Sequence, residues 1–163
     1  MKTAGVVAFA FGVPSSIRSN RLIALIASKR ARELDCRVYT QFDVNILPGI
    51  ETTYINQQDN NPPTTLRIAR GAVQWAVIHR LTELWIVAAK PCLDRALRDV
   101  QQTIREIEAE IKVYVCAEIN QYSEDSWFCM DSSQPRVRSR KEWRKRERIL
   151  KLMPFFLYKR IAN

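Results

Sequence analysis

The segment of residues 84–99 constrains the fold of this chain most strongly. Residues 84–89, Leu-Trp-Ile-Val-Ala-Ala, are continuously apolar, which is typical of a strand buried on both faces of a sheet. The following residues change to the spacing of an amphipathic helix. A second change of this kind occurs near the start, where an apolar run at residues 4–11 and a turn at residues 12–16 precede helical periodicity over residues 17–34. Because α/β proteins bind ligands where strands turn into helices, both segments indicate where a site would lie.

The remaining pattern continues this alternation of strands and helices. It predicts strands at residues 37–42 and 112–117, a short extended piece at 51–55, and helices at 93–111 and from Pro62 or Pro63 to about Arg80. A polar loop rich in turn-forming residues covers residues 43–63. We therefore expect a Rossmann-like, three-layer α/β fold with a mainly parallel sheet of four or five strands. Right-handed crossovers would bring the loops after residues 4–11 and 84–89 to the same edge of the sheet.

Length and charge predict the domain organisation. A chain of 163 residues fits one domain with an appended segment. The formal net charge of +9 lies entirely in residues 136–160, which contain eleven Lys or Arg and two Glu. We expect an α/β domain over residues 1–135 and a basic, amphipathic C-terminal helix within residues 136–163 that packs on the same domain.

Three interpretations of the basic segment stay open. It is a closing helix that packs Trp143, Leu150, Phe156 and Tyr158 on the domain, a nucleic-acid-binding element, or an attachment to an anionic membrane surface. The membrane interpretation is supported by the apolar and aromatic residues 155–158, Phe-Phe-Leu-Tyr, beside Lys159 and Arg160.

Apolar runs and cysteines predict the cellular setting. No run approaches the roughly 18 apolar residues that a membrane-spanning helix needs. Residues 5–13 resemble the apolar part of a signal peptide, but a buried first strand is the favoured interpretation. The four cysteines are widely spaced and His79 is the only histidine, so we expect no metal site and a reduced, cytoplasmic protein, peripheral to the membrane at most.

The turn at residues 12–16 is the first candidate site. Backbone N–H groups at a helix start, together with serine hydroxyls, favour an anion such as phosphate or carboxylate. Gly12, Ser15 and Ser16 would supply these donors. The glycine-rich nucleotide-binding fingerprints are absent, and simple N-capping by Ser15 or Ser16 is the competing interpretation.

Lys90, Cys92 and Arg95 form the second candidate site, at the start of the helix that follows residues 84–89. A helix N-terminus lowers the pKa of a nearby thiol, which would make Cys92 reactive, whereas a passive thiol is the commoner case. Arg95 would close over an anion bound at the strand end, and a surface ion pair with a neighbouring acidic residue is its alternative role.

The chain also resembles a known family, the uncharacterised α/β domain represented by YdcF, SanA and ElyC. The matching features are the apolar first strand with its glycine turn, Ser15 or Ser16, Arg21-Leu22, a threonine at position 64 or 65, Arg95-Ala96, and the ending with Trp143, Arg144, Glu147 and residues 154–158. The resemblance spans most of the chain. It implies a Rossmann-like fold, binding of a nucleotide or S-adenosylmethionine, and an association with envelope metabolism.

The chain departs from the family pattern at several polar positions. Cys92 replaces the family's histidine and Ala88-Ala89 replaces its Thr-Ser, and the family's Ser-Gly-Gly after the second strand is missing near residues 40–42. Arg21, Thr65 and Arg95 carry over. We therefore expect an anionic, nucleotide-like ligand that Arg21 and Arg95 neutralise and Ser15, Ser16 and Thr65 orient. The sequence assigns no reaction, and a non-enzymatic scaffold with a basic C-terminal segment is the alternative function.

Overall fold

The chain folds into one five-stranded sheet in which all strands run parallel. The computed structural model describes residues 3–56 and 62–162. The strands are β1 (Ala4–Ala8), β2 (Arg37–Thr40), β3 (Thr52–Tyr54), β4 (Glu83–Val87) and β5 (Lys112–Val115). Their order is β3-β2-β1-β4-β5, so the chain moves outward from β1 to β3 and then crosses back to β4 on the other side of β1. This order confirms the predicted Rossmann-like α/β fold.

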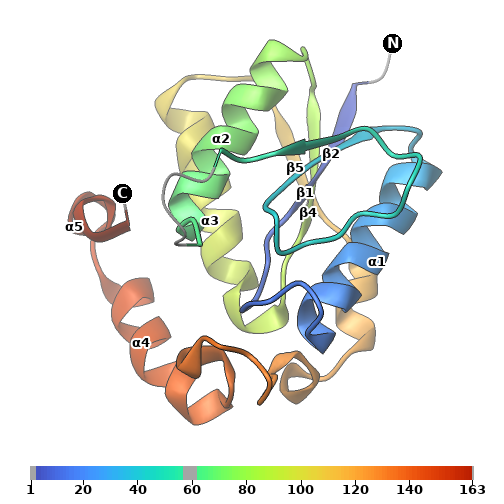
Figure 1. The fold of residues 1–163 in the computed structure, drawn as a ribbon. Coiled ribbons are helices and arrows are strands. Elements are labelled where there is room, and N and C mark those ends of the chain that lie inside the picture. Colours follow the sequence, from blue (N-terminus) through green and yellow to red (C-terminus); the bar gives the residue numbers. More distant parts are fainter. Residues whose placement is uncertain (1–2, 57–61, 163) are drawn as a thin grey trace.

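Helices cover both faces of the sheet. Helix α1 (Arg18–Glu33) lies on one face, and α2 (Thr65–Ile78) and α3 (Lys90–Glu106) pack together on the other, as Figure 1 shows. Three short 3₁₀ helices, η1 (Ala117–Gln121), η2 (Glu124–Trp127) and η3 (Pro135–Val137), lead to α4 (Arg140–Leu152) and α5 (Phe155–Ala162). In Figure 1 this C-terminal segment passes the lower end of the sheet and ends beside α2 and α3.

The core is centred on β1 and β4, the two most apolar strands. They pair over five residues each, from Ala4 opposite Glu83 to Ala8 opposite Val87. Val6, Val7 and Ile86 are fully buried. Because both faces of these strands are covered by helices, both are apolar along their length except at Glu83, the first residue of β4.

Element ends differ from the prediction in ways that have local causes. The apolar run at residues 4–11 extends beyond β1 because Phe9 and Phe11 are buried in the loop that follows the strand. Helix α3 begins at Lys90, three residues earlier than predicted, because a proline in the first turn, Pro91, does not interrupt a helix. The short extended piece predicted at residues 51–55 contains β3, a parallel edge strand paired with β2. Residues 57–61 of the predicted polar loop lie outside the described residues.

The predicted capping of α1 by Ser15 or Ser16 is wrong. Ile17 occupies the N-cap position and no side chain caps the helix. The backbone N–H of Ile17 instead donates to the carbonyl of Pro14 at 3.3 Å, so the turn folds on itself before the helix starts. The serine hydroxyls are thus one or two residues too early to reach the first N–H groups of the helix.

The basic segment forms two helices rather than one. Helix α4 ends at Leu152, and Pro154 separates it from α5 because a proline nitrogen cannot donate the next helical hydrogen bond. Trp143, Leu150 and Tyr158 are buried as predicted, whereas Phe156 is 66% exposed, which contradicts its predicted packing role. The neighbouring Phe155 is partly buried instead, and the centroid of its ring lies 5.8 Å from that of Tyr158.

The C-terminal helices contact the body of the protein through specific polar groups. The indole N–H of Trp143 donates to the carbonyl of Pro91 at 3.1 Å, and a guanidinium nitrogen of Arg98 donates to the carbonyl of Leu150 at 3.1 Å. A small apolar cluster of Leu66, Leu150, Tyr158 and Ala162 joins α2 to both C-terminal helices. None of the described helices combines the length and the hydrophobicity that a bilayer-spanning helix needs.

Candidate functional site

A cleft of about 720 Å³ opens at the carboxyl edge of the sheet. Its walls come from the loop after β1, the residue after β2, the first turns of α2 and α3, and the C-terminal segment. The chain turns in opposite directions from β1 and from β4, so the cleft occupies the switch point where open α/β sheets bind ligands. The predicted convergence of the loops after the two most apolar strands is therefore observed.

Arg95 lies at the centre of the cleft wall, one turn into α3. Its Nε is 3.1 Å from both carboxylate oxygens of Glu147 on α4, and its terminal guanidinium nitrogen donates to the hydroxyl of Thr65 at 2.8 Å. Arg95 and Glu147 are both buried. The predicted alternative of a surface ion pair is therefore replaced by a buried pair that joins α3 to the C-terminal segment.

Two further arginines line the cleft from the C-terminal segment. Arg136, in η3, and Arg146, on α4, both contribute to the wall. Neither forms an ion pair with another described residue. Partial removal from water, together with the charges of Arg146 and Arg95, lowers the pKa of Arg136 to about 10, although its side chain reaches solvent at the rim. The cleft therefore concentrates positive charge that the protein itself neutralises only in part.

Glu142 is the acidic side chain among the charged groups that line the cleft. It is exposed on the first turn of α4 and makes no ion pair with a described residue. Glu147 neutralises the positive charge of Arg95. The two guanidinium groups of Arg136 and Arg146 therefore outweigh the single carboxylate of Glu142 in the electrostatic field of the cleft.

The start of α2 forms the second polar wall. Thr64 is the N-cap, and its hydroxyl accepts a hydrogen bond from the backbone N–H of Arg67 at 3.2 Å and donates to the carbonyl of Ala162. Thr65, the first residue of the helix, faces Arg95. The positive end of the α2 dipole thus lies beside the arginines, which makes this wall favourable for an anion.

Cys92 lines the cleft but does not have the character of a reactive thiol. It is 4% exposed. Burial raises its pKa to about 12, and the charge of Arg95 opposes this shift only in part. The helix start at which Cys92 lies would lower the pKa, so desolvation outweighs the local field here.

The loop after β1 is held by Asn20, a residue of α1. The Asn20 side chain accepts a hydrogen bond from the N–H of Phe11 at 2.8 Å and donates to the carbonyls of Gly12 at 2.9 Å and Pro14 at 3.0 Å. Gly12 has φ +94°, and a Cβ at this position would lie 2.7 Å from atoms of Ser132 and of Val137. The loop is therefore fixed from both sides, by α1 and by the C-terminal segment.

The predicted site residues divide into two groups. Gly12, Thr65, Cys92 and Arg95 line the cleft. Ser15, Ser16, Arg21 and Lys90 are not among its lining residues. Ser15 accepts a hydrogen bond from Asn45 at 3.2 Å, while Ser16 and Arg21 are exposed and Lys90 is half-buried at the start of α3. Among the described residues there is no cluster of three or more side chains that could hold a metal ion.

Sequence reasoning missed Gln41, Arg136, Arg146 and Glu147 as parts of this region. The charge density of residues 136–160 is the signal that could have indicated the two arginines, because it marks the segment although not the face on which each side chain lies. Gln41 follows β2 directly, and its side chain accepts a hydrogen bond from the N–H of Ala10 at 3.1 Å. It thereby ties the loop after β1 to the next strand.

No model of a known protein family matches this chain, and no curated protein matches it either.

Proposed function

We propose that the protein binds an anionic, nucleotide-like small molecule in the cleft at the carboxyl edge of the sheet. The observation that carries the proposal is the pair of cleft-lining guanidinium groups of Arg136 and Arg146, which make no ion pair with a described residue. Guanidinium groups bind phosphate and carboxylate through charge-assisted hydrogen bonds. Desolvation is the main cause of the lowered pKa of Arg136, and repulsion by Arg146 and Arg95 adds to it. An anion bound beside these guanidinium groups would offset that repulsion.

The shape and lining of the cleft support a small molecule rather than a bare ion. Its volume of about 720 Å³ falls in the range of roughly 300–1,000 Å³ that small-molecule sites have. Phe9, Phe11 and Trp143 provide apolar surface, while Gln41 and Thr65 provide polar groups. A phosphate at the arginines with an aromatic or sugar moiety against the apolar wall matches this division. The resemblance to the YdcF, SanA and ElyC domains implies a nucleotide or S-adenosylmethionine, and of these two only the nucleotide carries the phosphate that the arginines favour.

Arg95 has a different role in this proposal from the one predicted for it. Glu147 and Thr65 already use its Nε and one terminal nitrogen. Replacing Arg95 would leave Glu147 buried without a counter-charge, so a loss of binding would not separate the ligand site from the fold. We therefore assign the neutralisation of the ligand to Arg136 and Arg146, and the shaping of the cleft wall to Arg95.

The test is a thermal-shift screen with inorganic phosphate, AMP, ATP, S-adenosylmethionine and a sugar phosphate, with adenosine as the uncharged control. A ligand at about 100 times its dissociation constant adds roughly 2.7 kcal/mol of stability. We expect phosphate-bearing compounds to raise the melting temperature and adenosine to raise it less.

The matched variants are Arg146→Gln and Arg136→Gln against Arg148→Gln, which lies on α4 but outside the cleft lining. Loss of one charge-assisted hydrogen bond, worth about 1.5–3 kcal/mol, should weaken binding by roughly 10- to 150-fold in the two cleft variants. Equal effects of Arg148→Gln and Arg146→Gln, or equal shifts with AMP and adenosine, would refute the proposal.

A further inference from the structure

The outer face of α4 and α5 exposes large apolar side chains. Leu152 is 85% exposed, Phe156 66% and Ile149 63%. These residues belong to the last turn of α4 and the first turn of α5, so they are close in the chain and lie on both sides of Pro154. Large apolar side chains that are exposed to solvent on adjacent helical turns are typical of surfaces that bind another protein or a membrane.

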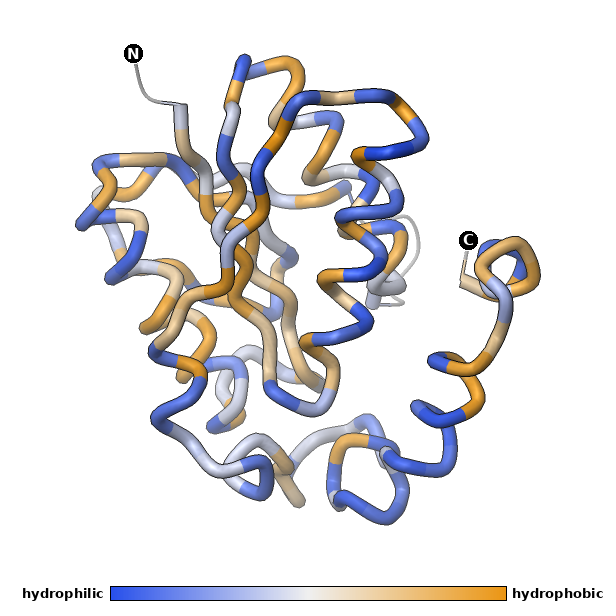
Figure 2. The backbone as a smooth tube through the Cα atoms, turned by 180° about the vertical axis from the view of Figure 1, so that it is seen from behind, coloured by the Kyte–Doolittle hydropathy of each residue, from blue (hydrophilic) through white to orange (hydrophobic). Residues whose placement is uncertain are grey.

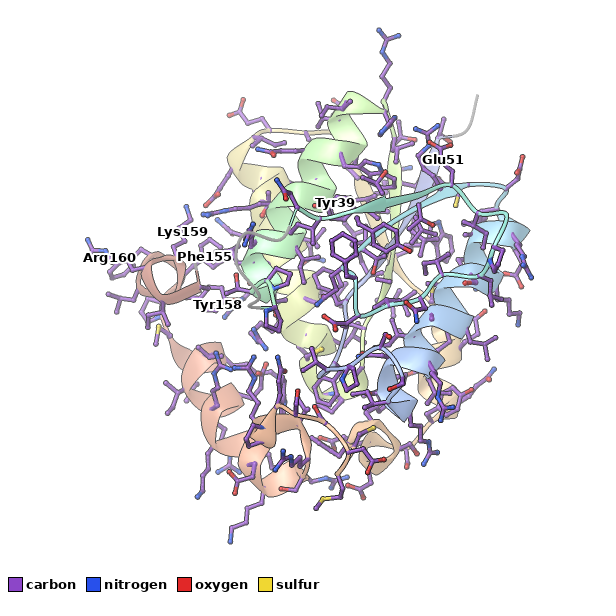
Figure 3. The ribbon with its side chains drawn as sticks, in the orientation of Figure 1. Tyr39, Glu51, Phe155, Tyr158, Lys159 and Arg160 are labelled. Carbon is purple, nitrogen blue, oxygen red and sulfur yellow. The ribbon has the colours of Figure 1, made fainter. Side chains whose placement is uncertain are left out.

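Helix periodicity places these side chains opposite the docked face. Trp143, Glu147 and Leu150 are buried in α4 at the spacing of one helix face. Leu152 and Lys145 lie at the opposite side of the helical wheel. In α5, Tyr158 and Ala162 are buried, and Figure 3 shows Tyr158 on the side of the body and Arg160 on the outer side. Figure 2 shows that hydrophilic and hydrophobic residues are interspersed along this segment.

The basic residues of this segment divide into two sets. Those that pair with acids of the body are Lys151 with Asp94 at 3.0 Å, Lys159 with Glu106, and Arg140 with Asp125 at 2.8 Å. The other basic residues of α4 and α5 make no ion pair with a described residue. Arg146 lines the cleft, and the remaining five are Lys141, Arg144, Lys145, Arg148 and Arg160. All five are exposed. The outer face thus combines unneutralised positive charge with exposed apolar side chains.

We propose that this outer face, formed by Lys145, Arg148, Ile149, Leu152, Phe156 and Arg160, attaches the protein to a bilayer that contains anionic lipids. Helices with this composition lie in the interface, with apolar side chains among the acyl chains and Lys or Arg at the headgroups. Cations near an anionic surface contribute about 1 kcal/mol each. Nucleic acid would use the same charges but would not cover Leu152 and Phe156. The apolar side chains therefore favour a lipid surface.

The test is sedimentation of the full chain with vesicles of phosphatidylcholine alone and of phosphatidylcholine mixed with phosphatidylglycerol. We expect binding only to the mixed vesicles, and a loss of affinity at high salt. The double variant Lys145→Gln/Arg148→Gln should bind about 30-fold more weakly, and Leu152→Ser/Phe156→Ser at least tenfold more weakly. The positions are exposed, so unchanged melting temperatures would verify that the variants are folded.

Two control variants remove the same chemistry elsewhere on the surface. Ile78→Ser replaces a side chain that is 76% exposed at the end of α2, and Arg18→Gln replaces an exposed arginine at the start of α1. Both should bind the mixed vesicles as the wild type does.

The proposal is overturned by equal binding to neutral and mixed vesicles, by the absence of vesicle binding, or by control variants that bind the mixed vesicles as weakly as the outer-face variants do. It is also overturned by preferential binding of short duplex DNA that Leu152→Ser/Phe156→Ser leaves unchanged. None of these outcomes bears on the ligand cleft, which uses different arginines.

Discussion

The Nε of Arg95 on α3 lies 3.1 Å from each carboxylate oxygen of Glu147 on α4, and both side chains are buried. This pair connects residues that are 52 positions apart in the chain. It places the C-terminal segment, with Arg136 and Arg146, over the carboxyl edge of the sheet. The position of the two arginines that we assign to ligand binding therefore depends on a buried ion pair in which neither of them takes part.

Removing one partner of this pair should strongly destabilise the protein. Glu147→Gln leaves the guanidinium of Arg95 buried without its counter-charge, and we expect the free energy of unfolding to fall by about 3–5 kcal/mol. The double variant Arg95→Met/Glu147→Leu should recover much of this loss because neither charge is then buried. Urea unfolding followed by circular dichroism measures both. Glu142→Gln, an exposed position on α4, is the control and should change stability by less than about 0.5 kcal/mol.

Asn20 should be intolerant of an isosteric change. Asn20→Asp would place a carboxylate oxygen against the carbonyls of Gly12 and Pro14, where the amide now donates two hydrogen bonds. We expect a loss of about 3 kcal/mol in the free energy of unfolding, since two buried acceptors lose their donor and a charge is introduced. Ser16→Ala should have almost no effect because Ser16 does not cap α1. A large effect of Ser16→Ala together with a small effect of Asn20→Asp would contradict the observed structure of this turn.

Cys92 should not react with thiol reagents in the native protein. A pKa of about 12 leaves on the order of one thiol in 10,000 ionised at pH 8, and the side chain is buried. Alkylation followed by peptide mass mapping should find Cys92 unlabelled under native conditions and labelled in urea. Cys92→Ser serves as the assignment control. Rapid native labelling confined to Cys92 would instead indicate a nucleophilic thiol.

The stability that Tyr158 contributes to the folded protein should be lost at alkaline pH. Burial and the adjacent Asp99 raise the pKa of Tyr158 to about 12, from an ordinary value of 10.0. The folded state therefore keeps this proton more strongly than the unfolded state does. The resulting stability is fully present below about pH 10 and is lost as the pH rises towards about 12.

The measurement is the difference in unfolding free energy between the wild type and Tyr158→Phe as a function of pH. The difference should shrink from pH 9 to pH 12, because phenylalanine does not titrate. Cys92 and Cys116 also have raised pKa values, of about 12 and about 11, but they are present in both proteins and cancel. At neutral pH, Tyr158→Phe should cost about 1–3 kcal/mol, because buried Asp99 loses the hydroxyl that donates to it at 2.5 Å. If the difference in unfolding free energy between the wild type and Tyr158→Phe did not vary with pH, the pKa of Tyr158 would be the same in the folded and unfolded states.

Several features were predictable because they depend on neighbouring residues only. Continuous apolar runs at β1 and β4 and helical periodicity after each of them predicted a parallel α/β sheet, and the cleft lies at the carboxyl edge to which they pointed. The location of all net charge in residues 136–160 was also readable from composition. The topology of crossovers correctly placed the start of α3, with Arg95, at the same edge of the sheet as the loop after β1. Thr65, which accepts a hydrogen bond from Arg95, entered the predicted site only through the family resemblance.

The faces of the C-terminal helices were decided by the tertiary structure alone. Residues 136–160 are basic on nearly every side, so periodicity does not tell which cation pairs with the body, which lines the cleft and which meets solvent. That choice follows from the docking of Trp143, Glu147 and Tyr158 onto α3, which fixes the rotation of α4 and α5. Contacts between residues more than 50 positions apart have no local signature. For this reason the sequence determined the fold and the edge of the sheet, whereas long-range packing selected Arg136 and Arg146 for the cleft and left Leu152 and Phe156 outside it.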